Sequence, residues 1–321
     1  MKKTIIFLTA ALTAAMVLSS CASTKGASKA ADSAVGVAGV PYITLNNGAK
    51  MPAFGLGTVT QGSDEVCRES VKTALLAGYR HIDTAHGYRV ERGVGQGIKD
   101  SGIPREEIWL TSKLWPTEYG EGVTLAAIDK MLERLQTDYV DLLYIHHPIG
   151  DVLGAWKDME KAVAQGKVRT LGVSNFENDD ELLAQLLENA TIKPAIMQIE
   201  CHTMAQRTAE IEKIRANGMA VECWYTIGRA RPEVLEEPTL VEIAKRHGKT
   251  TPQIILRWHI QEGHSAIPGS KNPDHIRENL DIFDFELTDE EMNAIRASNK
   301  EKRIFQQTPE RLQSYLNIQL D

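Results

Sequence analysis

The chain has 321 residues, a formal net charge of −7 and 42% hydrophobic residues. These values are typical of a soluble globular protein, and the length suits one large α/β barrel or two ordinary domains. No Lys/Arg cluster or basic stripe is present, so we expect no nucleic-acid partner.

The N-terminal segment has the pattern of a targeting sequence. Lys2-Lys3 is a charged start, and the apolar run from Ile5 to Leu18 is too short to cross a bilayer comfortably. The run ends in Leu18-Ser19-Ser20-Cys21, which resembles the lipobox of bacterial lipoproteins, where cleavage leaves the Cys as the lipid-bearing first residue. We therefore predict a signal peptide over residues 1–20 and lipidation, with palmitate, at Cys21. The alternative is an ordinary signal peptide with an incidental Cys.

Residues 21–41 are rich in Ala, Ser, Gly and Lys, a composition that cannot bury an apolar core, so we expect a flexible tether. The residue after Cys21 is Ala22 and not Asp. By resemblance to the lipoproteins of Gram-negative bacteria, this favours the outer membrane if the host has one. The expected location is the cell envelope, with the chain held at the membrane by its lipid.

Beyond the tether, strand-like and helix-like segments alternate. Tyr42–Leu45 and the residues after Asn47-Gly48 predict a small hairpin, because Asn-Gly favours a tight primed turn. Asp64–Ala77 is amphipathic with acidic residues in its first turn, which predicts a helix. The same patterns predict eight strand–helix pairs, at residues 53–56 and 64–77, 79–83 and 91–100, 108–114 and 122–135, 140–146 and 152–165, 168–173 and 179–189, 195–199 and 206–217, 219–224 with helices at 240–247 and 252–262, and 265–268 and 274–281.

Two topologies compete for this alternation. Parallel strands buried on both faces have unbroken apolar runs, as Val140–Ile145 has. A six-stranded doubly wound sheet would need a glycine fingerprint at its first strand-to-helix turn, and Gly55-Leu56-Gly57 lacks the third Gly. We therefore predict an α/β fold, a (β/α)8 TIM barrel with an N-terminal β-hairpin, over residues 42–321. Beyond Lys300 the tail is polar, and we expect it over the barrel mouth.

Ionisable residues follow three successive predicted strands. Asp83 ends one strand with Tyr88 in the loop after it, and Lys113 and His146 end the next two. A parallel barrel brings these strand ends together, where a carboxylate, a phenol and a cation can transfer a proton. Taken singly, Asp83 could be a helix N-cap, Tyr88 a rim aromatic and Lys113 a solvated strand end. His146-His147 could bind a metal, but no third ligand lies at a plausible spacing, so we expect no metal.

Four motifs in order along the chain resemble the aldo-keto reductase superfamily. The resemblance covers about Tyr42 to Asn299 and implies a (β/α)8 barrel that binds extended NADPH and reduces a small carbonyl substrate. It also implies a catalytic tetrad of Asp83, Tyr88, Lys113 and His146. The motifs are Gly78-Tyr79-Arg80-His81-Ile82-Asp83-Thr84-Ala85, Thr111-Ser112-Lys113-Leu114-Trp115, Leu171-Gly172-Val173-Ser174-Asn175-Phe176 and Ile267-Pro268-Gly269-Ser270-Lys271.

The residue types of this tetrad suit carbonyl reduction, in which the cofactor supplies a hydride to carbon and the protein a proton to oxygen. A phenol has a pKa of about 10, and a neighbouring ammonium, here Lys113, is expected to lower the pKa of Tyr88. Asp83 would keep Lys113 charged and in place. His146 would donate a hydrogen bond to the substrate oxygen as negative charge develops on it.

The resemblance assigns further residues to the cofactor and the substrate. Ser174, Asn175 and Gln198 match positions that hydrogen-bond the nicotinamide carboxamide, with strand-end capping as the alternative reading. Trp224 matches the aromatic that stacks on the nicotinamide, with a core Trp as its alternative. Trp115 and His147 are expected to contact the substrate. Gly228, Arg229 and Arg231 could approach the pyrophosphate.

The segment that grips the adenosine 2′-phosphate in the family is represented here by Ser270, Lys271, Asn272 and His275. It departs from the family pattern, because Gly269 replaces the usual Lys and His275 the usual Arg. Lys271 can substitute as a point charge, and the N-terminus of the next helix attracts anions. We expect NADPH, with NADH as the alternative. Glu278 and Asn279 match the pair that contacts adenine.

Other readings stay open at this stage. A membrane-tethered sensor or scaffold that binds the cofactor with little turnover is the alternative function, because nicotinamide cofactors are scarce outside the cytoplasm. A sugar isomerase or aldolase would need a metal triad or a Schiff-base Lys, and neither is evident. Cys201 and Cys223 end consecutive strands, so one disulfide is possible, although free thiols are favoured. We expect a monomer.

Overall fold

The computed structural model describes Met1 and residues 36–320. The chain divides into two units, Met1–Asp32 and Ser33–Asp321, and residues 36–320 belong to the second. Residues 2–20 of the predicted signal peptide, the predicted lipidation site Cys21 and residues 22–35 of the predicted tether lie outside the described residues. In the described part of the chain, no helix is both long and apolar enough to span a bilayer.

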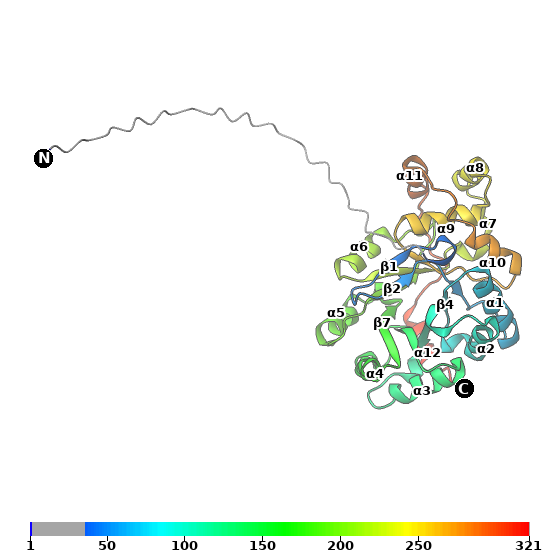
Figure 1. The fold of residues 1–321 in the computed structure, drawn as a ribbon. Coiled ribbons are helices and arrows are strands. Elements are labelled where there is room, and N and C mark those ends of the chain that lie inside the picture. The colour runs from blue at the N-terminus through cyan, green and yellow to red at the C-terminus, as the bar shows by residue number, and fades with distance from the viewer. Residues whose placement is uncertain (2–35, 321) are drawn as a thin grey trace. The chain divides into compact units, whose positions relative to one another are not determined.

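Eight parallel strands form one sheet in the sequential order β3 to β10, with helices around its outside (Figure 1). A parallel bridge between Phe54 and Ala266 joins the first strand to the last, together with a bond from the Gly57 nitrogen to the Pro268 oxygen at 3.1 Å. These contacts close the sheet into a ring, which confirms the predicted (β/α)8 barrel and excludes the open sheet. The strands are β3 (Leu56–Gly57), β4 (His81–Asp83), β5 (Trp109–Leu114), β6 (Val140–Ile145), β7 (Val168–Ser174), β8 (Ile196–Glu200), β9 (Ala220–Trp224) and β10 (Ser265–Ala266).

Several of the helices begin at residues that cap them, as α1 shows. Ser63 caps α1 by accepting a hydrogen bond from the Val66 nitrogen, and Gly78 ends α1 in the left-handed region at φ 116°. The helices are α1 (Asp64–Ala77), α2 (Glu91–Ser101), α3 (Thr124–Leu135), α4 (Val152–Ala164), α5 (Asp180–Asn189), α6 (Thr208–Ala216), α7 (Pro232–Leu235), α8 (Pro238–His247), α9 (Thr251–Gln261), α10 (Pro273–Leu280), α11 (Asp289–Ala297) and α12 (Pro309–Tyr315).

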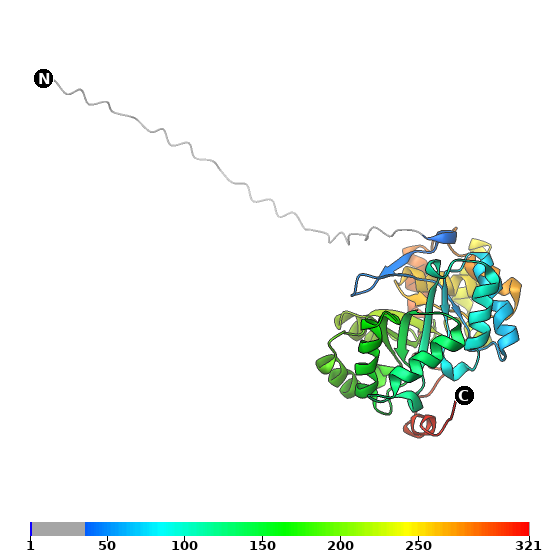
Figure 2. The same ribbon diagram turned by 60° about the horizontal axis from the view of Figure 1, so that its bottom comes forward.

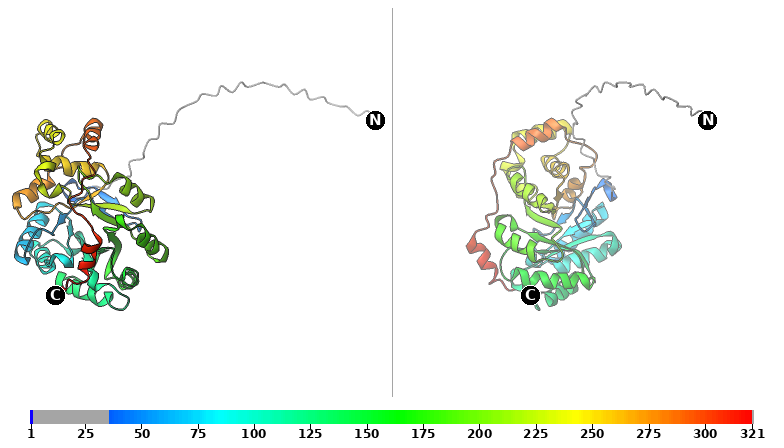
Figure 3. Two further views of the ribbon diagram at one scale, coloured as in Figure 1. Left: turned by 180° about the vertical axis from the view of Figure 1, so that it is seen from behind. Right: turned by 90° about the vertical axis from the view of Figure 1, so that its left-hand side faces the viewer.

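The predicted hairpin is present as β1 (Tyr42–Thr44) paired antiparallel with β2 (Lys50–Pro52). Its apolar side chains Leu45 and Met51 pack against Trp109, at the start of β5, and Ile196, at the start of β8. The hairpin therefore closes the N-terminal end of the barrel. Figure 2 and the right-hand view of Figure 3 show it at the end of the barrel opposite to α12.

The first and last strands are shorter than the predicted 53–56 and 265–268. Residues 53–55 bond to the last strand, with the Ala266 nitrogen 2.9 Å from the Ala53 oxygen, and only Leu56–Gly57 pairs with β4. The barrel therefore closes through two consecutive segments: residues 53–55 pair with the last strand, and Leu56–Gly57 pairs with β4. The tail, predicted to be polar and to lie over the mouth, forms a short helix, α12, on the side where the strands end (Figure 3).

Candidate active site

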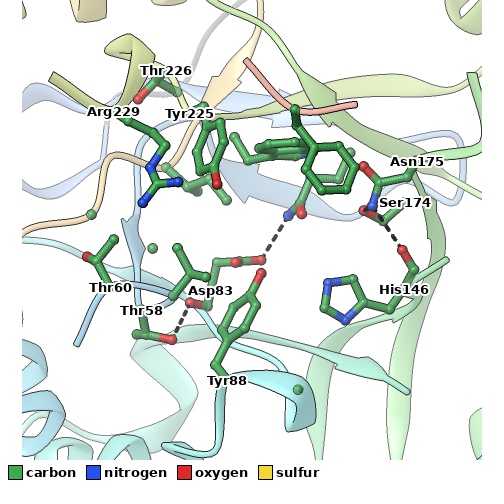
Figure 4. Close-up of a pocket in the computed structure, with 18 of the residues that line it drawn as sticks. Thr58, Thr60, Asp83, Tyr88, His146, Ser174, Asn175, Tyr225, Thr226 and Arg229 are labelled. Carbon is green, nitrogen blue, oxygen red and sulfur yellow. Dashed lines mark hydrogen bonds between the residues drawn. The ribbon is translucent and has the colours of Figure 1, made fainter. Parts of the chain in front are cut away.

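A cavity of about 470 Å³ opens at the carboxyl ends of the strands, a volume within the usual range for small-ligand sites (Figure 4). Strand ends and the loops after them supply its walls, as expected for a parallel barrel. The predicted site residues that line it are Asp83, Tyr88, Trp115, His146, His147, Ser174, Asn175, Gln198 and Trp224.

Asp83 and Lys113 form a buried ion pair at the base of this cavity. β4 and β5 are adjacent parallel strands, and Asp83 lies opposite Thr111, which brings the end of β4 beside Lys113. The Lys113 Nζ lies 2.6 and 2.8 Å from the two carboxylate oxygens of Asp83, and 2.9 Å from the Thr84 carbonyl oxygen. Burial lowers the pKa of Lys113, but the interactions with Asp83, Tyr88 and Glu222 together outweigh this effect, and the pKa lies above its usual value. The amine is therefore held as an ammonium.

Tyr88 reaches the pair from a short 3-10 helix, His86–Tyr88, that follows β4. A Cβ added at Gly87 would lie 2.7 Å from Trp115 Cε3, so glycine lets this turn pack closely on the indole. The Lys113 Nζ lies 5.0 Å from the centre of the Tyr88 ring, and the hydroxyl points toward the Asp83 carboxylate (Figure 4).

The pKa of Tyr88 moves in the direction opposite to the sequence-based expectation. Burial raises it to about 12, and the charge and hydrogen bond of Lys113 offset only part of that rise. Desolvation of the phenolate outweighs one ammonium whose charge is already shared with Asp83. At neutral pH Tyr88 is therefore a protonated phenol that can donate its proton.

His146 and His147 stack face to face beside Tyr88, with ring centres 4.4 Å apart. Burial lowers the pKa of His146 well below its usual value and that of His147 to about 3, so both rings are neutral. The Nδ1 atom of His146 is buried and has no hydrogen-bond partner in the described part of the chain, and Asn175 Nδ2 donates to the His146 carbonyl oxygen at 3.0 Å. A neutral imidazole with one ring nitrogen unpaired can bond a ligand oxygen.

A second buried carboxylate, Glu222 on β9, was missed by sequence reasoning. Gln198 Nε2 donates to Asp83 Oδ2 at 2.9 Å and to Glu222 Oε1 at 2.6 Å, so one amide joins the two acids. Tyr144 and Ser265 donate their hydroxyls to the same Glu222 carboxylate at 3.1 and 2.8 Å. Glu222 is the one acidic residue in the strand Ala220–Trp224, whose other residues are apolar. An acid within a predicted buried strand was the only sequence feature that could have indicated a functional residue here. The Gln198 amide nitrogen thus bonds carboxylates, whereas the resemblance implied a contact with the carboxamide.

The residues expected to contact a nicotinamide begin next to His146. Asn175 adopts φ 64° after β7, and its buried Oδ1 has no hydrogen-bond partner among the described residues. Ser174 and Trp224 line the same part of the cavity, and the Trp224 ring is half-buried with Phe305 5.4 Å away, edge to face. An unpaired amide oxygen beside a flat indole fits a carboxamide-bearing aromatic ring.

The residues expected around the 2′-phosphate and adenine lie outside the cavity lining, at its border. Gly269 lines the cavity, and the next residues run to α10 with Lys271, Asn272 and His275 exposed. Asn272 caps α10 through its Oδ1, which accepts from the Asp274 nitrogen at 2.9 Å. Ser270, Glu278 and Asn279 lie in the same segment, and Asn279 is buried on α10. Arg229 lines the cavity, whereas Gly228 and Arg231 do not.

The C-terminal tail contributes to the cavity. The sequence predicted a tail over the barrel mouth but did not predict which of its residues line the cavity. Glu200 Oε1 accepts from the Ile304 and Phe305 nitrogens at 2.6 and 3.1 Å. The Trp115 indole nitrogen donates to the Tyr315 carbonyl oxygen at 3.1 Å. Phe305 and Tyr315 thereby line the mouth, and the position of Phe305 depends on a carboxylate 105 residues earlier in the chain.

The barrel and the ionisable groups at the base of this cavity define a class of enzyme, and comparisons with known proteins agree. The Aldo/keto reductase family model matches residues 53–300. The glyoxal reductase of Bacillus subtilis is 43% identical over 263 residues, covering 82% of this chain and 94% of that protein. The 9,11-endoperoxide prostaglandin H2 reductase of Trypanosoma cruzi is 41% identical over 264 residues, covering 82% and 93%.

Solved structures show the same likeness. An aldo-keto reductase from a deep-sea metagenome library of the Medee basin has a TM-score of 0.79 and 41% identity, covering 83% of this chain and 97% of its own. An aldo-keto reductase of Bombyx mori, determined in complex with NADP, has a TM-score of 0.77 and 35% identity, covering 83% and 95%. The chain belongs to the aldo-keto reductase family, a family of NAD(P)H-dependent oxidoreductases.

Proposed function

We propose that this protein reduces a small aldehyde, ketoaldehyde or keto sugar to the alcohol with NADPH, and that Tyr88 is the general acid. One observation carries the proposal: a phenol, an ammonium–carboxylate pair and a neutral imidazole meet at the base of one cavity. The Tyr88 and His146 rings lie 5.7 Å apart and nearly perpendicular, which leaves their polar atoms free to converge on one ligand oxygen.

The nicotinamide, when bound, supplies a hydride to the carbonyl carbon of the substrate. Asn175 and Ser174 are the residues proposed to hold its carboxamide, and Trp224 its ring. The buried, unpartnered Oδ1 of Asn175 supports this assignment, because such an atom is costly unless a ligand donor completes it.

The proton comes from the protein. Tyr88, with its pKa raised to about 12, holds its proton at neutral pH and releases it to the substrate oxygen, which becomes more basic as hydride arrives. The phenolate left behind is stabilised by Lys113, whose charge Asp83 maintains. His146 hydrogen-bonds the same substrate oxygen. The negative charge that develops on this oxygen is therefore stabilised by a pre-oriented imidazole and not by bulk water.

The substrate class is proposed from the small cavity and from the relatives. The Bacillus subtilis relative is called a glyoxal reductase. Trp115, His147 and Tyr315 surround the entrance with flat apolar faces, 5.5 Å separating the Trp115 and His147 ring centres. A compact aldehyde can reach Tyr88 between them, whereas a bulky polar sugar chain would need the tail to move.

The test is steady-state turnover of methylglyoxal with NADPH by the full chain and by Tyr88→Phe. We expect kcat to fall by about 10²–10⁴-fold in the variant while NADPH binding, followed by fluorescence, is retained. Tyr139→Phe is the matched control, because Tyr139 precedes β6 at the far end of the barrel, and it should turn over normally. Near-native turnover in Tyr88→Phe would sink the general-acid assignment. Cofactor binding without turnover by the unaltered chain would favour the sensor instead.

We further propose that the protein is a lipoprotein of the cell envelope, anchored through Cys21. The support is the sequence alone: the charged start, the apolar run and Leu18-Ser19-Ser20-Cys21. Metabolic labelling with palmitate should mark the native chain and not Cys21→Ser, while Cys67→Ser should label normally. Unlabelled native chain in the soluble fraction would contradict the anchor without touching the proposed reaction.

A further inference from the structure

Four side chains of metal-binding type meet outside the catalytic cavity. Cys201 follows β8, Cys223 lies in β9, His259 is near the end of α9 and His264 directly precedes β10. Their nearest ligand atoms, the two Sγ and one ring nitrogen from each His, all lie within 4.8 Å of one another. The Cys residues and His259 are 0% exposed and His264 is 3% exposed, so water has little access to the group.

The spacing of these atoms suits a tetrahedral cation. Zinc binds sulfur at about 2.3 Å and imidazole nitrogen at about 2.0 Å, so the ligand atoms of a Cys2His2 site lie roughly 3.3–3.8 Å apart. The Nδ1 atoms of His259 and His264 are already 3.5 Å apart. Rotation of the two thiols about their χ1 bonds can supply the remaining contraction. The His259-x4-His264 spacing also falls within the range of zinc-binding His pairs.

The hydrogen bonds around His259 leave the correct nitrogen available. Its Nε2 lies 3.1 Å from the Thr226 carbonyl oxygen, and a carbonyl can only accept, so Nε2 carries the hydrogen. The lone pair of the neutral ring is then on Nδ1, the atom that faces His264 and the thiols. A backbone carbonyl that fixes the tautomer of a ligand His in this way is a usual partner of zinc sites.

Without a cation the group is poorly satisfied. The Nδ1–Nδ1 contact of 3.5 Å is long for an N–H···N hydrogen bond, and Cys201 Sγ donates to the Gln206 carbonyl oxygen at 3.5 Å, which is a weak contact. Two thiolates and two neutral imidazoles around a dication make an assembly with no net charge. A buried site of this kind avoids the cost of a buried net charge, and four ligand bonds replace the weak contacts among these side chains.

We propose that Cys201, Cys223, His259 and His264 bind one Zn²⁺ in a closed structural site. Each thiol loses its proton to solvent as its sulfur bonds the metal, each imidazole contributes a lone pair, and no group is oxidised or reduced. Four protein ligands leave no open position for substrate, so the site is structural.

The proposed metal would join three parts of the barrel that the catalytic cavity uses. Cys201 is next to Glu200, which anchors the tail, and Cys223 is next to Trp224 on the cavity wall. His264 leads into β10, which pairs with β9 through Ser265 and Glu222. Zinc would thus fix the spacing of β8, β9 and β10. The inference stands whether or not the proposed reaction is correct.

The experiment uses the full chain carrying Cys21→Ser, so that the predicted lipidation site adds no thiol to the assay. The reduced protein is stripped with a chelator, desalted and titrated with Co²⁺. We expect about one equivalent to bind with thiolate-to-cobalt charge-transfer absorption and intense tetrahedral d–d bands, and Zn²⁺ to displace it. Zinc should also raise the midpoint of thermal unfolding.

Cys201→Ser and His264→Gln should each weaken Co²⁺ binding by at least about 10-fold and abolish or reduce the charge-transfer band, as loss of one ligand predicts. Cys67→Ser is the matched control, because Cys67 is equally buried but lies on α1 outside the cluster, and it should bind as the parent does. Circular dichroism of each variant checks its fold.

A measurement on the Cys21→Ser parent covers variants that fail to fold. Zinc content is measured by elemental analysis, and titration with a mercurial reagent should release one zinc for every three thiols modified, two of them in the cluster and the third at Cys67. Three results would each overturn the proposal: less than about 0.1 equivalent of metal bound, a cobalt spectrum without thiolate bands, or a Cys201–Cys223 disulfide in the protein isolated from cells.

Discussion

Gln198 donates a hydrogen bond to Asp83, with 2.9 Å between Nε2 and Oδ2, from the strand that faces Asp83 across the barrel interior. The same nitrogen bonds Glu222 Oε1 at 2.6 Å. The two acids therefore share one amide, and burial raises the pKa of Glu222 above its usual value. The Asp83–Lys113 ion pair is one end of a continuous buried network.

Replacing Gln198 by Leu should lower the free energy of unfolding by about 3 kcal/mol, because two hydrogen bonds to buried carboxylates are lost with little change in volume. Urea denaturation measures the change. Met197→Leu, at the neighbouring position of β8, is the control and should cost less than about 1.5 kcal/mol. Equal stability of Gln198→Leu and the native chain would mean that the network contributes nothing to the fold.

The Lys113–Asp83 pair predicts an asymmetry between single and double substitutions. Lys113→Met leaves Asp83 as an unpaired buried acid and should cost about 3–5 kcal/mol of unfolding free energy. Lys113→Met with Asp83→Leu should recover most of that loss, and neither variant should reduce aldehydes. Thermal and urea unfolding report stability, and NADPH oxidation reports activity.

The exposed pair of Lys213 and Asp180 offers a comparison for that experiment. Lys213→Met should change stability by less than about 1 kcal/mol and leave activity intact, because surface pairs contribute little. Recovery of turnover in the double variant would contradict the role given to Lys113.

Acid should destabilise the protein through His81. Burial lowers the pKa of His81 from 6.5 to about 4. Below pH 6.5 the unfolded chain binds a proton that the folded chain does not, so the contribution of His81 to stability is complete above pH 6.5 and is lost as pH falls toward 4. The loss by pH 4 is about 3 kcal/mol, at about 1.4 kcal/mol per pH unit.

His81→Gln should flatten the dependence of unfolding free energy on pH between 6.5 and 4, measured by urea denaturation at several pH values. His275→Gln, at an exposed position, should leave the slope unchanged. A slope that is the same in all three proteins would show that His81 does not carry this proton linkage.

Lys271 should determine the preference for NADPH, because it is the exposed cation beside the N-terminus of α10. Lys271→Ala removes a point charge from the proposed 2′-phosphate site, so KM for NADPH should rise several-fold and KM for NADH should change little. Lys130→Ala, on the exposed side of α3, controls for net charge. Parallel changes for both cofactors would place the 2′-phosphate elsewhere.

Much of the fold was accessible from the sequence. Alternating apolar runs and capped amphipathic segments predicted the barrel, because buried parallel strands and their covering helices carry local signals in periodicity. The strand ends at Asp83, Lys113 and His146 followed from the same pattern, since a parallel barrel collects its strand ends at one mouth. The strands β3 and β10, where the barrel closes, were predicted too long. Their length depends on which neighbour each residue pairs with, and the local sequence pattern does not encode this pairing.

Tertiary structure alone decided which groups surround those strand ends. The pairing of Glu222 with Gln198, the attachment of the tail to Glu200, and the meeting of Cys201 with His264 join segments far apart in the chain, and no local pattern encodes such contacts. The pKa of Tyr88 could not be predicted from the sequence for the same reason. Its rise to about 12 comes from burial, which several elements of the folded chain create together. Residue types and their order determined the chemistry available to this protein, whereas distance and desolvation, which exist only in the folded chain, decided how each group behaves.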